Sequence, residues 1–260
     1  MSNLVESWRV QRRVIQALMI RELNTRFGRE NIGFLWVMVE PLLFAGLVAI
    51  TWRAMKGPEE HGVDIIVFVI SGYIPLTLFR HAVTRCIKVF EVNSSLLYHR
   101  QITIFDFLIV RFLIEMIGAM LAFTFIATVL HFFGLFPAPK SMGFLLAGWL
   151  LYSIFTLSLC LIIAPLSEFS EVLEKVLPVA TYIMIPFSGT FNMVEWLPAA
   201  ARPYMLWSPF VSAMEMIRYG LFGDAVYPYY DVSVVLVVAM ICSAIGLALC
   251  RRVRRRLTVE

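Results

Sequence analysis

Long apolar blocks separated by short polar segments dominate the pattern of this chain. A helix needs about 20 apolar residues to cross the hydrocarbon core of a bilayer, and most of these blocks approach or exceed that length. The pattern predicts six membrane-spanning helices, at about residues 32–52, 63–79, 104–133, 142–166, 177–190 and 232–249. The fifth is the shortest, and Pro178 and Pro186 bracket it. We therefore expect an all-α polytopic membrane protein.

Three polar segments carry most of the Lys and Arg residues: 1–31, 80–101 and the tail at 251–260. Short loops rich in Lys and Arg stay in the cytoplasm. Six spans place both termini on one side, so both are expected to be cytoplasmic. Within 1–31, apolar residues recur at helical spacing at Val10, Val14, Ala17 and Leu18. This spacing predicts an amphipathic helix in the membrane interface, although a solvated helix leading into the first span fits it too.

The segment 80–101 is too polar to span. One apolar stripe is formed by Val83, Ile87, Phe90 and Leu97, while charged residues face elsewhere, namely Arg85, Lys88 and Glu91. An amphipathic helix of this kind suits docking into a groove on a soluble partner. A helix lying passively on lipid headgroups has the same pattern.

The composition excludes a soluble protein, because 60% of the 260 residues are hydrophobic and only 15% are charged. The four cysteines and four histidines lack the spacing of metal ligands or of redox motifs, so we expect no metal site. No hydrolase motif is present, and no GxxxxGK[ST] loop exists to bind ATP phosphates. The chain is therefore predicted to be a transport subunit without catalytic residues, powered by another subunit or by an ion.

Three charged residues fall inside apolar runs: Glu40, Arg111 and Glu115. An intramembrane acid is a candidate for ion coupling. For Arg111 and Glu115, which are four residues apart on one helix, we favour an internal ion pair or a position near the membrane surface. Two acids without an internal repeat give weak support to an ion-driven transporter, which would lose activity when Glu40 is neutralised.

Residues 187–230 are rich in aromatic side chains. Tyr and Trp gather at membrane interfaces, and part of the set fits that role. Aromatic faces also stack on sugar rings, so this region is a candidate path or gate for a glycan. The candidate residues are Phe187, Phe191, Trp196, Tyr204, Trp207, Phe210, Glu215, Arg218 and Tyr219.

Five short motifs occur in order along the chain. The first is Arg21-Glu22 with Arg26-Phe27-Gly28, Gly33-Phe34-Leu35-Trp36 and Glu40-Pro41; the others are Ser71-Gly72-Tyr73-Ile74-Pro75, Tyr98-His99-Arg100-Gln101, Glu174-Lys175-Val176-Leu177-Pro178, and Trp207-Ser208-Pro209-Phe210 with Glu215 and Arg218. Together they resemble the ABC-2 type polysaccharide-export permeases, closest to the capsular polysaccharide exporters of Gram-negative bacteria. The family usually has Pro at or near the position of Gln101, so the geometry of that turn is open.

The resemblance implies a homodimeric inner-membrane permease that exports lipid-linked capsular polysaccharide. Two separate ABC ATPase subunits would bind Mg-ATP, and periplasmic and outer-membrane components would complete the export route. The amino-terminal helix and the 80–101 segment would transmit ATPase movements, and the helices in 187–230 would form a periplasmic gate. The coupling residues implied in this way are Arg21, Glu22, Arg26, Arg85, Lys88, Glu91, Tyr98 and Arg100.

Other functions remain open at this point. Export of O-antigen or teichoic acid would use the same architecture, and so would an ABC-2 exporter of a lipid or a drug. A membrane enzyme acting on lipid-linked sugars would instead turn over its substrate without ATP.

Overall fold

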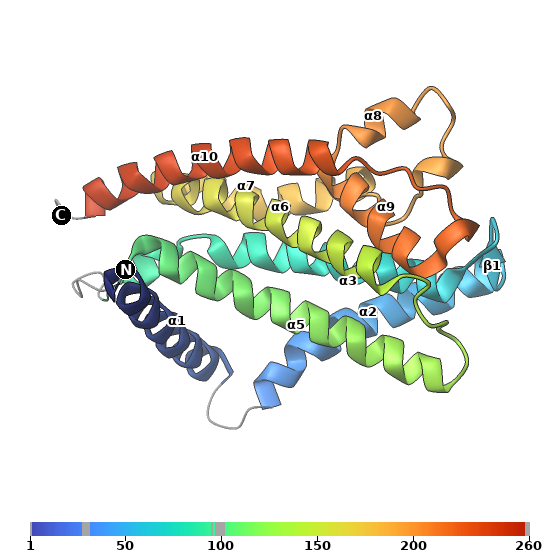
Figure 1. Ribbon diagram of the computed structural model, residues 1–260, viewed down its shortest axis with the longest axis horizontal. Helices are drawn as coiled ribbons and strands as arrows, with labels where there is room; N and C mark the ends of the chain where they lie inside the picture. Colours follow the sequence, from blue (N-terminus) through green and yellow to red (C-terminus); the bar gives the residue numbers. More distant parts are fainter. Residues whose placement is uncertain (1, 28–31, 95, 97–101, 258–260) are drawn as a thin grey trace.

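A computed structural model describes residues 2–27, 32–94, 96 and 102–257 of the chain. The helices run in an elongated bundle with both termini at one end (Figure 1). In chain order they are α1 (Ser2–Phe27), α2 (Ile32–Lys56), α3 (Ile65–Cys86), α4 (Val89–Val92), α5 (Ile104–Phe132), α6 (Met142–Phe169), α7 (Glu171–Ile183), α8 (Arg202–Leu206), α9 (Pro209–Phe222) and α10 (Val232–Leu257). A two-stranded antiparallel hairpin, β1 (Glu59–Glu60) and β2 (Val63–Asp64), joins α2 to α3 at the opposite end. The predicted all-α class is confirmed.

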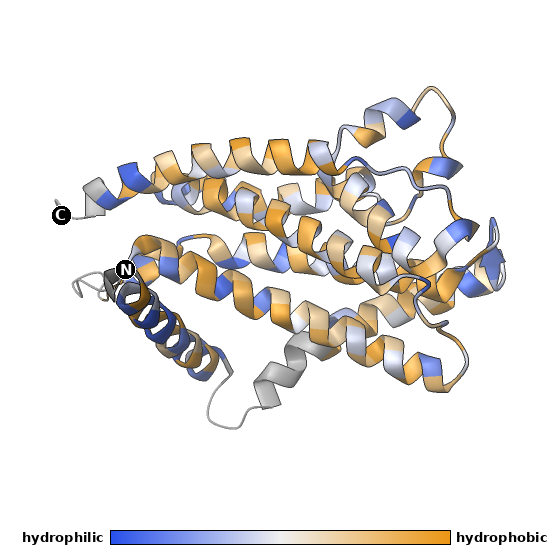
Figure 2. Ribbon diagram, viewed as in Figure 1, coloured by the Kyte–Doolittle hydropathy of each residue, from blue (hydrophilic) through white to orange (hydrophobic). Residues whose placement is uncertain are grey.

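Within the described residues, four helices are long and apolar enough to cross a membrane: α3, α5, α6 and α10. Apolar residues cover these helices, whereas α1 is largely polar (Figure 2). The 29 residues of α5 extend about 44 Å at 1.5 Å per residue, which exceeds the hydrocarbon core. The chain thus has the helices of a multi-pass membrane protein.

The predicted first and fifth spans are not among these four helices. The first lies in α2, where only part of the helix has described side chains. The fifth lies in α7, whose 13 residues extend only about 20 Å. Pro178 lies inside α7, and the chain turns into a 3-10 helix at Ile185–Ser188 instead of continuing outward. Six complete spans therefore remain a prediction.

Helix α3 is the central helix of the bundle, with 78% of its apolar window buried. Asp64 accepts hydrogen bonds from the backbone N–H groups of Ile66 (2.8 Å) and Val67 (3.1 Å), so an acidic cap fixes the start of α3 directly after the hairpin. A capping box of Thr103 and Asp106 starts α5 in the same way.

Glycines allow α6 to pack closely against α9 and α10. A Cβ added to Gly220 of α9 would lie 2.4 Å from the backbone nitrogen of Leu145 in α6. On the other side, a Cβ on Gly246 of α10 would lie 2.6 Å from Cβ of Leu161. Small residues at such crossings are the usual means by which membrane helices approach one another.

The 80–101 segment is not one amphipathic helix in its described part. Its first seven residues, through Cys86, complete α3, and a separate four-residue helix α4 follows after Lys88. Lys88 adopts the left-handed conformation (φ 53°), which breaks the helix there. Val83 and Phe90 of the predicted stripe are buried, as expected.

The amino-terminal helix was predicted correctly in type and in most of its apolar face. Leu18 is buried, and Val14 is half-buried against the core, whereas Ala17 is exposed. The apolar face packs against protein because α1 lies beside the beginning of α5 (Figure 1).

Candidate coupling site at the terminal end of the bundle

Two ion pairs attach α1 to α5. Glu22 Oε1 lies 3.2 Å from Arg111 Nε, and Arg26 pairs with Glu115. Both helices contribute residues four apart, which lie on one face of a helix. The two faces therefore meet in parallel register, and a hydrogen bond from Gln11 to Asp106 extends the same contact.

Glu115 is the hub of this cluster, because its side chain is only 1% exposed and basic side chains from two other helices surround it. Besides Arg26 of α1, it has His81 Nδ1 at 3.6 Å and Arg85 Nε at 4.0 Å, both from α3. His81 Nε2 in turn lies 3.7 Å from Glu40 of α2. One buried carboxylate thus joins α1, α3 and α5, and His81 extends the network to α2.

The expected ion pair between Arg111 and Glu115 was wrong in its partners. Among the described residues, the ion pairs of these two side chains lead to other helices, and Arg111 Nη1 also donates to the backbone carbonyl of Arg85 (2.7 Å). The physical reason is that α1 brings charges of opposite sign to both positions at once, which satisfies each group without leaving the other unpaired.

Hydrogen bonds hold α4 between α1 and the end of α6. On one side Arg21 Nη1 donates to Asn93 Oδ1 (3.1 Å), and on the other Glu168 Oε1 accepts from the backbone nitrogens of Phe90 (3.0 Å) and Glu91 (3.2 Å). The backbone nitrogen of Lys88 donates to Ser167 Oγ (3.0 Å). These hydrogen bonds therefore attach α4 to both α1 and α6.

A charged pair lies on the outer side of α4. Lys88 Nζ is 2.6 Å from Glu91 Oε2, and this hydrogen bond raises the pKa of Lys88. Glu91 is exposed, so the pair is open to solvent or to a partner surface.

Four of the predicted coupling residues, Arg21, Glu22, Arg26 and Arg85, line one cavity of about 370 Å³ between α1, α3, α4 and α5. Four arginines and one glutamate are among its lining residues, which gives the cavity a strong positive charge; the lining consists of Arg21, Glu22, Thr25, Arg26, Thr84, Arg85, Ile87, Val92, Asn93 and Arg111. Lys88 and Glu91 lie on the outer side of α4 and do not line this cavity. Tyr98 and Arg100 lie outside the described residues, as does the turn at Gln101.

Sequence reasoning missed several residues of this site. The sequence around His81, which lies within α3, gave no sign that this residue joins the site. Asn93, Ser167 and Glu168 form hydrogen bonds with partners that are 70 or more residues distant in the chain. Long-range partners of this kind leave no periodic signal in a single sequence.

At the opposite end of the bundle, Phe210, Glu215 and Arg218 of α9 are buried. Arg218 donates from Nη1 to the carbonyls of Gly189 (2.7 Å) and Asn192 (3.1 Å), and from Nη2 to that of Thr190. Its guanidinium also lies 4.1 Å from the ring centroid of Phe68.

Glu215 binds the same loop by accepting a hydrogen bond from the backbone nitrogen of Val194 (3.1 Å). Together with Arg218 it fastens residues 189–194 to α9. In this conformation these two side chains and Phe210 present no surface to a glycan, because the loop and the neighbouring helices cover them.

The other predicted glycan residues divide into packed and exposed groups. Phe191 packs against Trp52 (5.4 Å between ring centroids), Trp196 against Phe68 (4.7 Å), and Tyr219 against Phe144 (5.1 Å). The exposed residues are Phe187, Tyr204 (81% exposed) and Trp207 (83% exposed). Their contact with a glycan stays a prediction.

Comparison with known proteins places this chain in a family. Residues 13–222 match the ABC-2 type transporter family. The capsule polysaccharide export inner-membrane protein BexB of Haemophilus influenzae is 35% identical over 94% of this chain and 92% of its own length. The corresponding protein CtrC of Neisseria meningitidis serogroup B is 36% identical over the same shares.

A more distant relative is the polysialic acid transport protein KpsM of Escherichia coli, which is 26% identical over 93% of this chain and 94% of its own length. These relatives match nearly the whole chain, and the family region at residues 13–222 contains the second part of α1, the charged cluster on α5 and the buried α9. This chain is a member of the ABC-2 type transporter family.

Proposed function

We propose that this chain is the permease subunit of an exporter that moves lipid-linked capsular polysaccharide across the bacterial inner membrane. The observation that carries the proposal is the 35–36% identity to two capsule polysaccharide export proteins over 94% of the chain. Two copies of the chain would form the membrane part, and two ABC ATPase subunits would bind Mg-ATP. Both termini would face the cytoplasm, where the positive charge of the chain gathers.

The charged cluster supports a role in coupling. A soluble ATPase would reach the exposed outer side of α4, where Lys88 and Glu91 lie. Contacts of α4 with α1 and α6 would pass a displacement on to the bundle. Glu115 would then redistribute the movement, since it holds α1, α3 and α5 together.

The opposite end of the bundle would be the exit side for the glycan. Exposed aromatic rings of Phe187, Tyr204 and Trp207 suit contact with sugar rings. Arg218 and Glu215 would act as positioning residues that keep the 189–194 loop in place.

A second candidate, O-antigen export, rests on the O-antigen export system permease protein RfbA of Klebsiella pneumoniae, which is 20% identical over 91% of this chain. Deletion of the gene for this chain separates the two. Capsule export predicts that glycan accumulates inside the cell on a phospholipid-type anchor with a short acidic-sugar linker. A polyprenyl-diphosphate anchor would indicate O-antigen export, and normal surface glycan in the deletion strain would refute both.

A further inference from the structure

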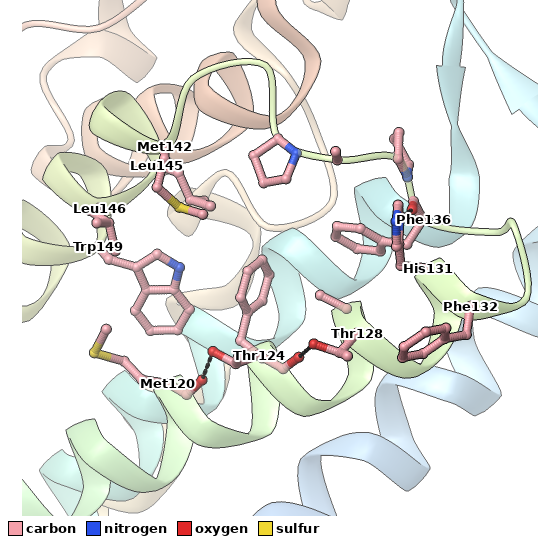
Figure 3. Close-up of a pocket in the computed structure, with 15 residues that line it drawn as sticks. Met120, Thr124, Thr128, His131, Phe132, Phe136, Met142, Leu145, Leu146 and Trp149 are labelled. Carbon is pink, nitrogen blue, oxygen red and sulfur yellow. Dashed lines mark hydrogen bonds between the residues drawn. The ribbon is translucent and has the colours of Figure 1, made fainter.

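An apolar cavity of about 300 Å³ lies between α5 and α6, at the end of the bundle opposite the termini. Its floor is formed by three buried aromatic residues, Phe123, Phe136 and Trp149, and the ring of Phe123 makes edge-on contacts with the other two rings. Figure 3 shows Leu145, Leu146 and Trp149 on the α6 side, Thr124 and Thr128 on the α5 side, and the connecting loop above them.

Three polar side-chain groups of the lining have hydrogen-bond partners within the protein. Thr124 Oγ1 donates to the carbonyl of Met120 (2.8 Å), and Thr128 Oγ1 donates to that of Thr124 (2.7 Å). His131 Nδ1 is paired with the carbonyl of Phe136 (2.8 Å). The walls therefore leave little for a water molecule to bond, and apolar cavities of this kind take apolar ligands.

The cavity lies between two helices, α5 and α6, that are long and apolar enough to cross a membrane, and it is open on one side. Its rim carries apolar side chains that protein does not cover, among them Phe132 (83% exposed), Met142 and Leu146. Since α5 and α6 are both long and apolar enough to cross a membrane, this uncovered apolar rim suits contact with lipid acyl chains. The exposed cation Lys140 directly follows the lining residue Pro139, so a positive charge lies where the loop leaves the cavity.

We propose that this cavity binds one acyl chain of a bilayer phospholipid from the leaflet at the end of the bundle opposite the termini. The chain would enter between Phe132 and Leu146 and lie over the ring of Trp149. The phosphate of the same lipid would remain at the level of the Lys140 amino group, which matches its negative charge.

Photolabelling of the full chain in phospholipid vesicles tests this proposal. The vesicles contain only synthetic phosphatidylglycerol and phosphatidylethanolamine, part of it with a diazirine on the acyl chain. A label on the protein therefore comes from bilayer lipid and not from the anchor of a lipid-linked glycan. After irradiation, mass spectrometry of peptides should find adducts on the buried floor, at Trp149, as well as on the outer surface. Adducts on the outer surface with none at Trp149 would overturn the proposal. This result would mean that lipid does not enter the cavity, for example because a second copy or another helix covers it.

A filling variant provides the second readout. Ala127 lines the cavity, so Ala127→Trp should lower the adduct yield at Trp149 about tenfold, which corresponds to about 1.4 kcal/mol of binding free energy. Leu121→Trp is the matched control, because Leu121 is exposed on the same helix and does not line the cavity. Equal yields at Trp149 in the two variants would also overturn the proposal. If Ala127→Trp fails to fold, Thr128→Phe fills the same space.

Discussion

Exchanging the charges of Glu22 and Arg111 tests the attachment of α1 to α5. In the unaltered protein Glu22 Oε1 lies 3.2 Å from Arg111 Nε. The single variants Glu22→Arg and Arg111→Glu each replace this pair of opposite charges with two like charges. We expect either single variant to reduce export of polysaccharide to the cell surface, and the double variant to restore most of it, because the exchange recreates the pair with reversed sign.

The magnitude follows from the geometry of the pair. Two unit charges 3.2 Å apart attract by about 5 kcal/mol at an effective dielectric constant of about 20. The side chains are 16% and 24% exposed, so desolvation and side-chain entropy offset part of this energy. A net coupling of about 1–3 kcal/mol is expected, between that of surface pairs and that of tightly buried ones.

Restoration in the double variant should be incomplete for a specific reason. Arg111 also donates a hydrogen bond to the carbonyl of Arg85, and glutamate at position 111 cannot replace it. A net hydrogen bond contributes about 1 kcal/mol, so the double variant should remain that much less stable than the unaltered protein.

The assay is a double-mutant cycle on the purified protein in detergent, with unfolding followed by fluorescence, together with antibody staining of surface polysaccharide on cells. Glu6→Arg is the matched control, because it makes the same change of charge at an exposed site on α1. If the effects of the two single variants add to within about 0.3–0.5 kcal/mol, Glu22 and Arg111 do not interact and the proposed attachment is refuted.

Three further predictions concern other parts of the bundle. Gly220→Leu should lower the free energy of unfolding by about 1–3 kcal/mol, because the new side chain overpacks against α6. Gly46→Leu is the control and should change this free energy little, because no atom lies within 4 Å of a Cβ added there. Equal midpoints of thermal unfolding in the two variants would contradict the close packing of α9 on α6. Arg218→Met should leave buried carbonyls without donors and cost about 3–5 kcal/mol, and Arg218→Lys should recover little because it lacks the planar fork; an unchanged unfolding midpoint would exclude the fastening role. The double variant Arg85→Glu/Lys88→Glu should abolish export while the permease still inserts at normal abundance, as measured by surface staining and membrane immunoblot; unchanged export would refute the docking role of the 80–101 segment.

The helical architecture was readable from the sequence because hydrophobic blocks and amphipathic spacing are local signals. The stripe through Val14 and Leu18 predicted α1 and most of its buried face. Boundaries were less accurate, since α3 continues beyond residue 79 to Cys86. Polar residues extend the helix there and find contacts in other helices, for instance Arg80, whose guanidinium lies 3.9 Å from the ring centroid of Tyr182 in α7.

The partners of charged residues were not readable in the same way. The sequence identified Glu115 and Arg111 as unusual, but their pairing with α1 depends on how two helices about 90 residues apart meet. A similar limit applies to α9, where Arg218 was expected on a glycan surface. Its burial depends on three backbone carbonyls that a loop supplies, and composition carries no trace of such partners.

ATP-dependent movement of polysaccharide in inside-out membrane vesicles tests the central claim most directly. Vesicles from cells that contain this chain and its partner subunits are supplied with labelled lipid-linked capsular polysaccharide, and glycan protected from added glycosidase is measured. The proposed function predicts that protected glycan accumulates only when both this chain and hydrolysable ATP are present. Equal accumulation in vesicles without the chain, or with a non-hydrolysable analogue in place of ATP, would contradict it.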